Sequence, residues 1–182
     1  MLPRARMLRR TAPVLAAVAA VAVAASPAQA AGTKKYLWAT VNICDTAKHP
    51  NQMGVRGSLP GTGNSGKMFI RFTAQYFDAG HNTWANVKGT DTSPWVLAGS
   101  SERRYRQAGY TFNFDAPSPP GSTFLLRATA DFKWTERHRV SKHSKKFHTV
   151  VIKRRRAITS PGHLNTLGAD PKDYSSDKCQ IS

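Results

Sequence analysis

The sequence is poor in acidic residues and in cysteine. Its 182 residues include 10 Asp and Glu against 27 Lys and Arg, and only 2 Cys. Charged residues make up 20% and apolar residues 40% of the chain, which excludes a wholly disordered acidic protein. The 13 Gly and 11 Pro residues also exclude a collagen-like chain. The length is typical of one domain.

Long apolar runs are absent except near the N-terminus. Four arginines in residues 1–10 precede an Ala/Val-rich stretch over residues 12–25, which leads to Ala28-Gln29-Ala30. Small residues at the −3 and −1 positions are typical of a cleavage site, so residues 1–30 are predicted to be a signal peptide. The stretch is shorter than the ~20 residues of a membrane-spanning helix. We expect a secreted protein of the cell exterior, with residues 31–182 as a single domain and no transmembrane segment after cleavage.

The two cysteines, Cys44 and Cys179, lie near the two ends of this predicted domain. An oxidising compartment favours a disulfide, and two cysteines allow one pairing. The alternative is a metal site, but it would need more ligands and the chain has no C-x-x-C spacing. We predict a Cys44–Cys179 disulfide.

Most of the predicted domain alternates between apolar and polar residues. The alternation is clearest over residues 124–134 and recurs over residues 35–44, 68–77 and 110–114. Successive side chains of a strand point to opposite faces, so this pattern predicts half-buried antiparallel strands. Shorter strand candidates, separated by turn residues, are 55–59, 84–87, 94–98, 147–153 and 176–181.

About seven to nine short strands predict an all-β antiparallel sandwich. Residues 101–108 are the only candidate for a helical turn, so at most one short helical turn is expected. Trp134 belongs to the apolar row of its strand, so we expect it in the core. Tyr36 and Trp38 alternate with the aliphatic residues of their strand. They form either an exposed aromatic pair for a sugar or a protein partner, or a pair packed under a loop or the N-terminal tail.

Three segments carry a resemblance to a known group of proteins. They are Asn-Ile-Cys-Asp-Thr-Ala-Lys at residues 42–48, Arg-Gln-Ala-Gly-Tyr at residues 106–110 and Cys-Gln-Ile at residues 179–181. With the order of strands and loops, they make the chain resemble secreted bacterial proteins that have an immunoglobulin- or fibronectin III-like β-sandwich.

The resemblance implies an Ig-like fold over most of residues 35–182 but no catalytic residues, because that group has no assigned activity. In antibody domains the cysteines bridge the two sheets. Here they lie near the chain ends, and we expect the disulfide to be a terminal staple instead.

Residues 61–67, Gly-Thr-Gly-Asn-Ser-Gly-Lys, match the beginning of a phosphate-binding loop. Met68 stands where Ser or Thr would hold Mg²⁺, and a strand is predicted where that motif needs a helix. We therefore expect a Gly/Ser loop and no nucleotide.

No metal or other cofactor is predicted. His138, His143 and His148 have cationic neighbours that repel a metal ion, and the aspartates of residues 170–177 lack the EF-hand spacing. Glu102 and Glu136, the only glutamates, lie beside arginines, which suggests ion pairing.

We expect no enzymatic activity. The alternative is a secreted hydrolase with a site built from loops.

The strongest departure from average composition is a basic run over residues 137–156. Its twenty residues contain nine cations and no acid: Arg137, Arg139, Lys142, Lys145, Lys146, Lys153, Arg154, Arg155 and Arg156. We expect a hairpin tip at residues 138–146 and the end of the return strand at the cluster 153–156. Cations would then lie at both ends of that strand, ~25 Å apart. A third cluster consists of Arg103, Arg104 and Arg106.

Lys and Arg side chains bind polyanions by releasing counterions, so the binding weakens with salt. We hypothesise that the basic run contacts an anionic polymer of the cell envelope, without base-specific reading of nucleic acid. Two alternatives stay open. In the first, the run is a basic surface that only serves solubility. In the second, the protein binds an extracellular protein through a strand edge or an apolar patch.

Overall fold

The computed structural model describes residues 35–89 and 92–182. The predicted signal peptide, residues 1–30, lies outside the described residues. The described residues form nine strands: β1 (Trp38–Thr46), β2 (His49–Pro60), β3 (Lys67–Asp78), β4 (Thr83–Asn86), β5 (Val96–Ser100), β6 (Tyr105–Asn113), β7 (Phe124–Arg139), β8 (Phe147–Ile158) and β9 (Cys179–Ile181).

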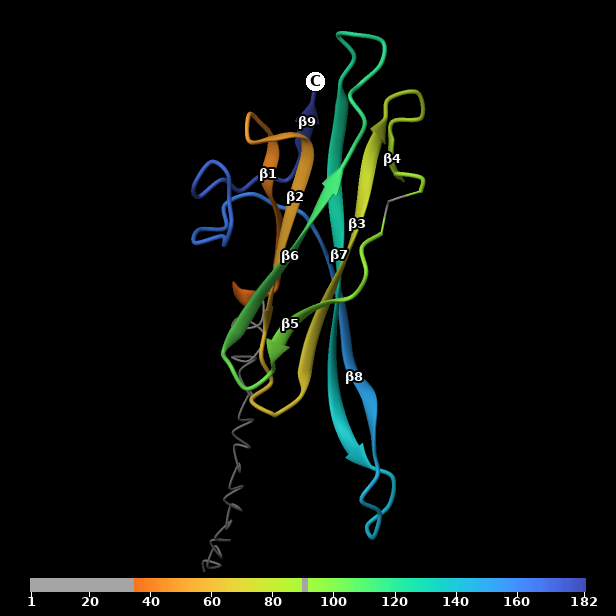
Figure 1. Ribbon diagram of the computed structural model, residues 1–182, viewed down its shortest axis with the longest axis vertical. Coiled ribbons are helices and arrows are strands. Elements are labelled where there is room, and N and C mark those ends of the chain that lie inside the picture. The colour runs from red at the N-terminus through yellow and green to blue at the C-terminus, as the bar shows by residue number, and fades with distance from the viewer. Residues whose placement is uncertain (1–34, 90–91) are drawn as a thin grey trace, which may run out of the picture.

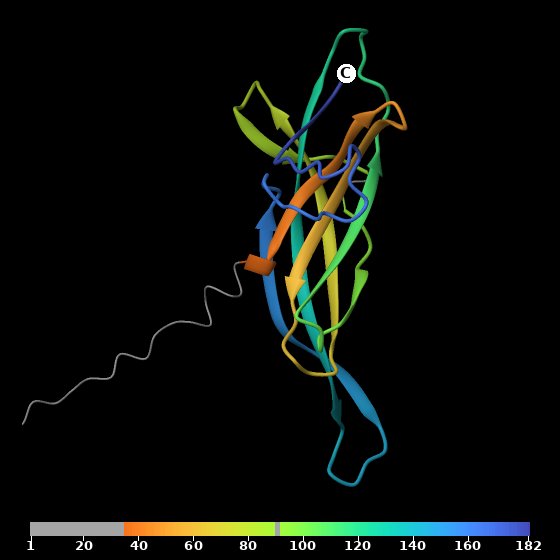
Figure 2. The ribbon, with the colours of Figure 1, turned by 90° about the vertical axis from the view of Figure 1, so that its left-hand side faces the viewer.

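The strands pair in two antiparallel sheets (Figures 1 and 2). The first sheet has the order β1-β2-β6. The second has the order β4-β3-β7-β8, with β5 also paired to β3 and β9 also paired to β7. The predicted all-β, sandwich-like fold is therefore confirmed, and every predicted strand is present.

The core consists of alternate residues from both sheets. In β7, Leu126, Ala128, Ala130, Phe132 and Trp134 are all buried. They lie with the apolar rows of β1, β2 and β3 in one continuous cluster. The indole Nε1 of Trp134 donates a hydrogen bond to the backbone oxygen of Pro60 at 2.8 Å, so its polar atom is satisfied. The predicted burial of Trp134 is confirmed.

The candidate helical turn over residues 101–108 is not formed, which agrees with the limit of at most one short turn. Residues 101–104 are a turn, and β6 begins at Tyr105. The backbone of the turn bonds to the β2–β3 loop, because the Thr62 N–H donates to the Ser101 oxygen at 3.0 Å. Pairing with β2 then fixes the following residues as a strand, which overrides local propensity.

The expected end of the basic return strand at residues 153–156 is also wrong. Strand β8 continues to Ile158, which pairs with Thr129 of β7. The long edge of β7 supplies hydrogen-bond partners over this whole length, so residues 153–156 lie inside a strand rather than at its end.

The Cys44–Cys179 disulfide is confirmed, with a Cα–Cα distance of 5.3 Å. Cys44 lies in β1 of the three-stranded sheet. Cys179 lies in β9, which pairs with β7 of the six-stranded sheet. The bond therefore joins the two sheets, as in antibody domains, and the expectation that it would not bridge them is wrong. It bridges them because the short C-terminal strand β9 pairs with the second sheet.

The C-terminal segment, residues 159–178, lies along the free edge of β1. Val41 and Ser176 exchange two backbone hydrogen bonds, at 2.9 and 3.1 Å. The Asn42 amide Nδ2 donates to the Gly168 oxygen at 2.8 Å. The Val41 bonds occupy backbone groups that an exposed edge strand would leave unpaired, and the Asn42 side chain fastens the loop beside them.

We predict that replacing both Cys44 and Cys179 by Ser lowers the free energy of unfolding by about 5 kcal/mol, because the closed loop of 135 residues no longer restricts the unfolded chain. Urea unfolding of both proteins measures the difference. A reducing agent should destabilise the wild type to the same extent and leave the double variant unchanged. A difference below about 1 kcal/mol would contradict the role of the bond.

Candidate functional site

Strand β7 carries a row of cations on the side opposite the core. Its even-numbered residues from Leu126 to Trp134 are buried, so the odd-numbered residues face outward. Four of these are cationic: Arg127, Lys133, Arg137 and Arg139. At about 3.3 Å per residue, the row extends over about 40 Å.

The two strands beside β7 add three cations at the centre of this row, opposite Asp131 and Lys133. Arg71 of β3 pairs in register with Asp131 of β7. Arg156 of β8 pairs with Asp131 from the other side, and Arg154 pairs with Lys133. Residues that pair across strands share a face of the sheet. We call the resulting set the basic stripe: Arg71, Arg127, Lys133, Arg137, Arg139, Arg154 and Arg156.

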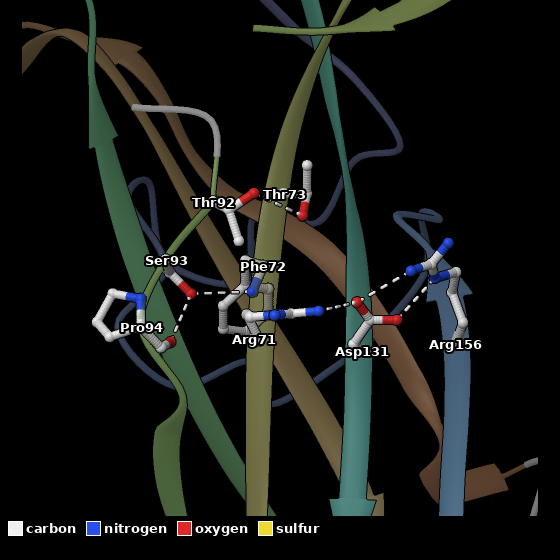
Figure 3. A network of polar contacts seen from close by, with 8 residues as sticks. All are labelled: Arg71, Phe72, Thr73, Thr92, Ser93, Pro94, Asp131 and Arg156. Carbon is white, nitrogen blue, oxygen red and sulfur yellow. Dashed lines mark hydrogen bonds and ion pairs between the residues drawn. The ribbon is translucent and has the colours of Figure 1, made fainter. Parts of the chain in front are cut away.

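Asp131 is the acid at the centre of the stripe (Figure 3). It accepts hydrogen bonds from Arg156 Nε at 2.7 Å and Arg156 Nη2 at 3.0 Å, and from Arg71 Nη2 at 3.3 Å. Burial alone would raise the pKa of Asp131, but the hydrogen bonds and charges of Arg156 and Arg71 hold this pKa below its ordinary value. The carboxylate thus stays ionised and fixes two guanidinium groups of the stripe.

Aromatic rings lie beside several of the other cations. Lys133 Nζ is 4.0 Å from the ring centroid of Trp95, and the Arg71 guanidinium is 4.8 Å from it. The Arg127 guanidinium is 4.3 Å from the ring of Trp84. Cation–π attraction at such exposed sites contributes about 0.5–1 kcal/mol and limits the motion of the long side chains.

The segment that carries Trp95 is fastened to β3 (Figure 3). The Phe72 N–H donates to Ser93 Oγ at 2.9 Å, and this hydroxyl donates to the Pro94 oxygen at 2.8 Å. The Thr73 and Thr92 hydroxyls lie 3.2 Å apart. These bonds hold residues 92–95, the segment that leads to β5, beside the stripe.

The cations of the stripe are crowded. The pKa of Lys133 is lowered by its burial and by the nearby charges of Arg154 and Arg71. Such repulsion costs free energy in the unliganded protein and is relieved when an anion binds. Perturbed cations in a cluster are a recognised indication of a functional surface.

The stripe continues onto the β7–β8 hairpin, which projects past the neighbouring strands (Figure 1). Arg137 and Arg139 lie 4.8 and 5.7 Å from the ring centroid of Phe147. The turn beyond them is closed by a hydrogen bond from the Val140 N–H to the Lys146 oxygen at 3.1 Å. The hairpin thereby presents further exposed cations: Lys142, Lys145 and Lys146.

The structure divides the predicted basic run among three places. Arg137, Arg139, Arg154 and Arg156 belong to the stripe, and three lysines belong to the hairpin turn. Lys153 and Arg155 pair with Trp134 and Phe132, so they lie on the other face of β8. Of the nine predicted cations, four therefore belong to the stripe, three to the hairpin turn (Lys142, Lys145 and Lys146) and two to the other face of β8.

The third predicted cluster is not part of the stripe. Arg103 and Arg104 lie in the β5–β6 turn, and Arg106 lies in β6 of the other sheet. The Arg104 guanidinium is 4.9 Å from the ring centroid of Tyr36.

Sequence reasoning missed three members of the stripe, Arg71, Arg127 and Lys133. They are scattered along the chain, so a search for consecutive charges does not find them. Their signal is the period-two pattern itself, because all three occupy outward positions of strands that the pattern identifies.

The phosphate-loop-like residues 61–66 connect β2 to β3, and a strand begins at Lys67. Asn64 binds the Glu136 carboxylate, and its own Oδ1 accepts from the Gly66 N–H at 3.1 Å. This loop therefore does not lead into the helix N-terminus on which that motif depends.

The histidines of the basic run are separated by the hairpin. His138 and His148 are cross-strand neighbours with ring centroids 6.2 Å apart, and His143 lies in the turn. Within residues 35–89 and 92–182, no three His, Cys, Asp or Glu side chains are grouped closely enough to hold a metal ion.

One serine–histidine pair bears on the hydrolase alternative. Ser160 Oγ and His163 Nε2 share a hydrogen bond of 2.9 Å, and burial lowers the pKa of His163. A catalytic triad also needs a group that orients the histidine. Among the described residues, no carboxylate bonds to His163; its ring instead stacks on Trp38 with centroids 4.3 Å apart.

Comparison with known proteins gives no match to a family model, to a curated protein or to a solved structure. Over the part of the chain that the structure describes, no helix has the length and apolar character needed to cross a bilayer.

We predict that Asp131→Asn lowers the free energy of unfolding by about 1 kcal/mol at pH 7, a value reduced for the exposure of Arg156. Because the pKa of Asp131 is depressed in the folded protein, its contribution is present above its ordinary value of about 3.9. The contribution is lost as the pH falls through the folded-state pKa.

Urea unfolding at pH 7 and at acidic pH measures the effect. The difference between Asp131→Asn and the wild type should shrink below about pH 4. Asp115→Asn, which alters an exposed carboxylate, is the control and should match the wild type at both pH values. Equal stability of all three proteins at pH 7 would contradict the role of Asp131.

Proposed function

We propose that the protein is a secreted, non-enzymatic binding module that contacts an anionic polymer of the cell envelope along the basic stripe. One observation carries the proposal. Seven cations from three strands share one face of the six-stranded sheet, and Asp131 is the acid that β7 places among them. We also propose that the fold is Ig-like, which is supported by the two antiparallel sheets and the disulfide that joins them.

The shape of the stripe favours a linear polymer over a small anion. Outward residues of β7 recur about every 7 Å, and the row extends over about 40 Å. A small anion would be held by a few convergent donors in a concave site. A polymer with a charge on every repeat can meet many of these cations at once, and it releases several counterions when it binds.

The stripe is also preorganised. The backbone of β7 is paired along both edges, and the rings of Trp84 and Trp95 already restrict the side chains of Arg127, Arg71 and Lys133. Less conformational entropy is then lost on binding. A surface that served only solubility would have no need for this organisation, and its charges would be spread over both sheets.

We predict that Arg137→Gln, Arg139→Gln and Arg154→Gln, combined, weaken binding to sodium polyphosphate roughly tenfold or more at low salt. The plot of log affinity against log salt concentration should become less steep by about 2–3, because each lost contact removes about 0.7–0.9 from the slope. None of the three arginines bonds to Asp131, so the centre of the stripe stays intact. Isothermal titration calorimetry from 50 to 200 mM salt, a range in which such contacts weaken strongly, measures both quantities.

The matched control is Lys48→Gln, Lys172→Gln and Lys178→Gln, which removes the same charge from exposed positions outside the stripe. It should bind polyphosphate nearly as well as the wild type, and neither protein should bind neutral dextran. An equal loss in both triple variants would mean that net charge alone attracts the polymer, and the proposal would be wrong.

Removal of the central acid should have the opposite effect. We predict that Asp131→Asn binds polyphosphate severalfold more tightly than the wild type, because Arg71 and Arg156 are released from their internal partner. Asp115→Asn changes the net charge equally and should show a smaller gain. An affinity of Asp131→Asn at or below that of Asp115→Asn would place the polymer elsewhere on the protein.

A further inference from the structure

A second surface feature lies on the three-stranded sheet, independently of the basic stripe. It is a cleft with a volume of about 320 Å³ between residues 35–38, β6 and the C-terminal segment. Its lining includes four rings, Tyr36, Trp38, Tyr105 and His163. The other side chains and backbone come from Lys35, Ser58, Gln107, Gly162, Leu164 and Asn165.

One row of the sheet forms part of this lining. Trp38 of β1 pairs with Ser58 of β2, and Ser58 pairs with Gln107 of β6, so the three residues lie side by side on one face. That face points away from the core, because the next residues along β1 and β2, Ala39 and Leu59, are fully buried in the core.

The rings occur as two stacked pairs. Trp38 and His163 have centroids 4.3 Å apart and planes within 9°. Tyr36 and Tyr105 have centroids 5.0 Å apart and planes within 7°. Tyr105 is 43% exposed, so its ring remains available to a ligand. Tyr36 and Trp38 are thus both half-buried, and Trp38 packs against His163 of the C-terminal loop, as one of the two alternatives expected.

The wall that carries His163 is held in place by hydrogen bonds. Gln107 Nε2 donates to the Asn165 oxygen at 3.3 Å, and the Leu167 N–H donates to Gln107 Oε1 at 3.2 Å. The His163 N–H donates to Ser175 Oγ at 3.0 Å. The C-terminal loop therefore needs no ligand to keep the cleft open.

Polar groups accompany the rings. The Ser58 hydroxyl is buried and has no hydrogen-bond partner among the described residues. Lys35 lies at the cleft, and the Arg104 guanidinium is 4.9 Å from the ring of Tyr36. Among the lining residues that the structure describes, none is Asp or Glu.

We infer that this cleft is a carbohydrate-binding site that takes a pyranose ring of a saccharide. A sugar ring presents apolar C–H faces that pack on aromatic rings, and its hydroxyl groups bond to amide, hydroxyl and ammonium groups at the edges. Amphipathic rings together with a few placed polar groups form the kind of site that such a ligand requires. A purely apolar ligand would leave those polar groups without partners, at a cost in free energy.

Pyranose rings occur in neutral and in acidic saccharides. The described lining has cations beside it and no carboxylate, so the cleft can accept either kind. The experiment therefore compares four probes: cellohexaose, chitohexaose, mannohexaose and hexagalacturonate.

The test is calorimetric titration of the protein with each hexasaccharide at 150 mM salt. We expect at least one probe to bind, and Tyr105→Ala to weaken that binding at least tenfold. Tyr110→Ala, which removes a similarly exposed ring from the same strand outside the cleft, should bind as the wild type does. Circular dichroism of both variants checks that they are folded.

A second measurement does not depend on a variant. In an NMR titration with the bound saccharide, the indole N–H resonance of Trp38 should shift, and that of Trp95 beside the basic stripe should not. If no hexasaccharide binds, or if Tyr105→Ala and Tyr110→Ala are equally affected, the inference is overturned. A shift of Trp95 instead of Trp38 overturns it as well.

The triple arginine variant of the basic stripe separates this inference from the proposed function. It should retain saccharide binding at the cleft whether or not it binds polyphosphate. Loss of neutral saccharide binding in that variant would assign the sugar to the stripe and overturn the inference.

Discussion

The pairing of β7 along both edges is the constraint on which the core and the basic stripe depend. Strand β3 pairs with one edge from Lys67↔Thr135 to Tyr76↔Leu126. Strands β9 and β8 pair with the other edge. With both neighbours fixed, one side of β7 must face the core and the other must face solvent. A shift by one residue would place Lys133 in the core and Trp134 in water, so the apolar row also fixes where the cations stand.

The stripe contributes little to the stability that makes it possible. Exposed ion pairs contribute about 0–1 kcal/mol, and the cations of the stripe repel one another. Trp134, Phe132 and the rest of the apolar cluster stabilise the fold by removing apolar surface from water. The crowding of Lys133 with Arg154 and Arg71 is a cost that this core offsets, and the aromatic rings and Asp131 only limit it. Such a separation between the groups that fold the protein and the groups that would bind its ligand is typical of β-sheet scaffolds.

The segments that carry the sequence resemblance have structural roles. Asn42 bonds to the C-terminal loop, and Cys44 joins the two sheets through Cys179. A Cβ atom at Gly109 would lie 2.7 Å from the Val55 oxygen, so that position in β6 admits only glycine without a backbone shift. These residues hold the three-stranded sheet and the C-terminal loop together. Asn42, Cys44 and Gly109 themselves line neither the cleft nor the stripe.

The sequence by itself determined the strands, the burial of Trp134 and the disulfide, because alternation and cysteine count are local or unambiguous signals. Only the tertiary structure decided which cations act together. The consecutive Arg154, Arg155 and Arg156 face alternate sides, whereas Arg71 and Arg156, far apart in the chain, meet at Asp131. It also decided that the C-terminal loop would lie against β1 and form a cleft. The physical reason is that strand register and loop placement arise from contacts between segments distant in sequence, which no local pattern encodes.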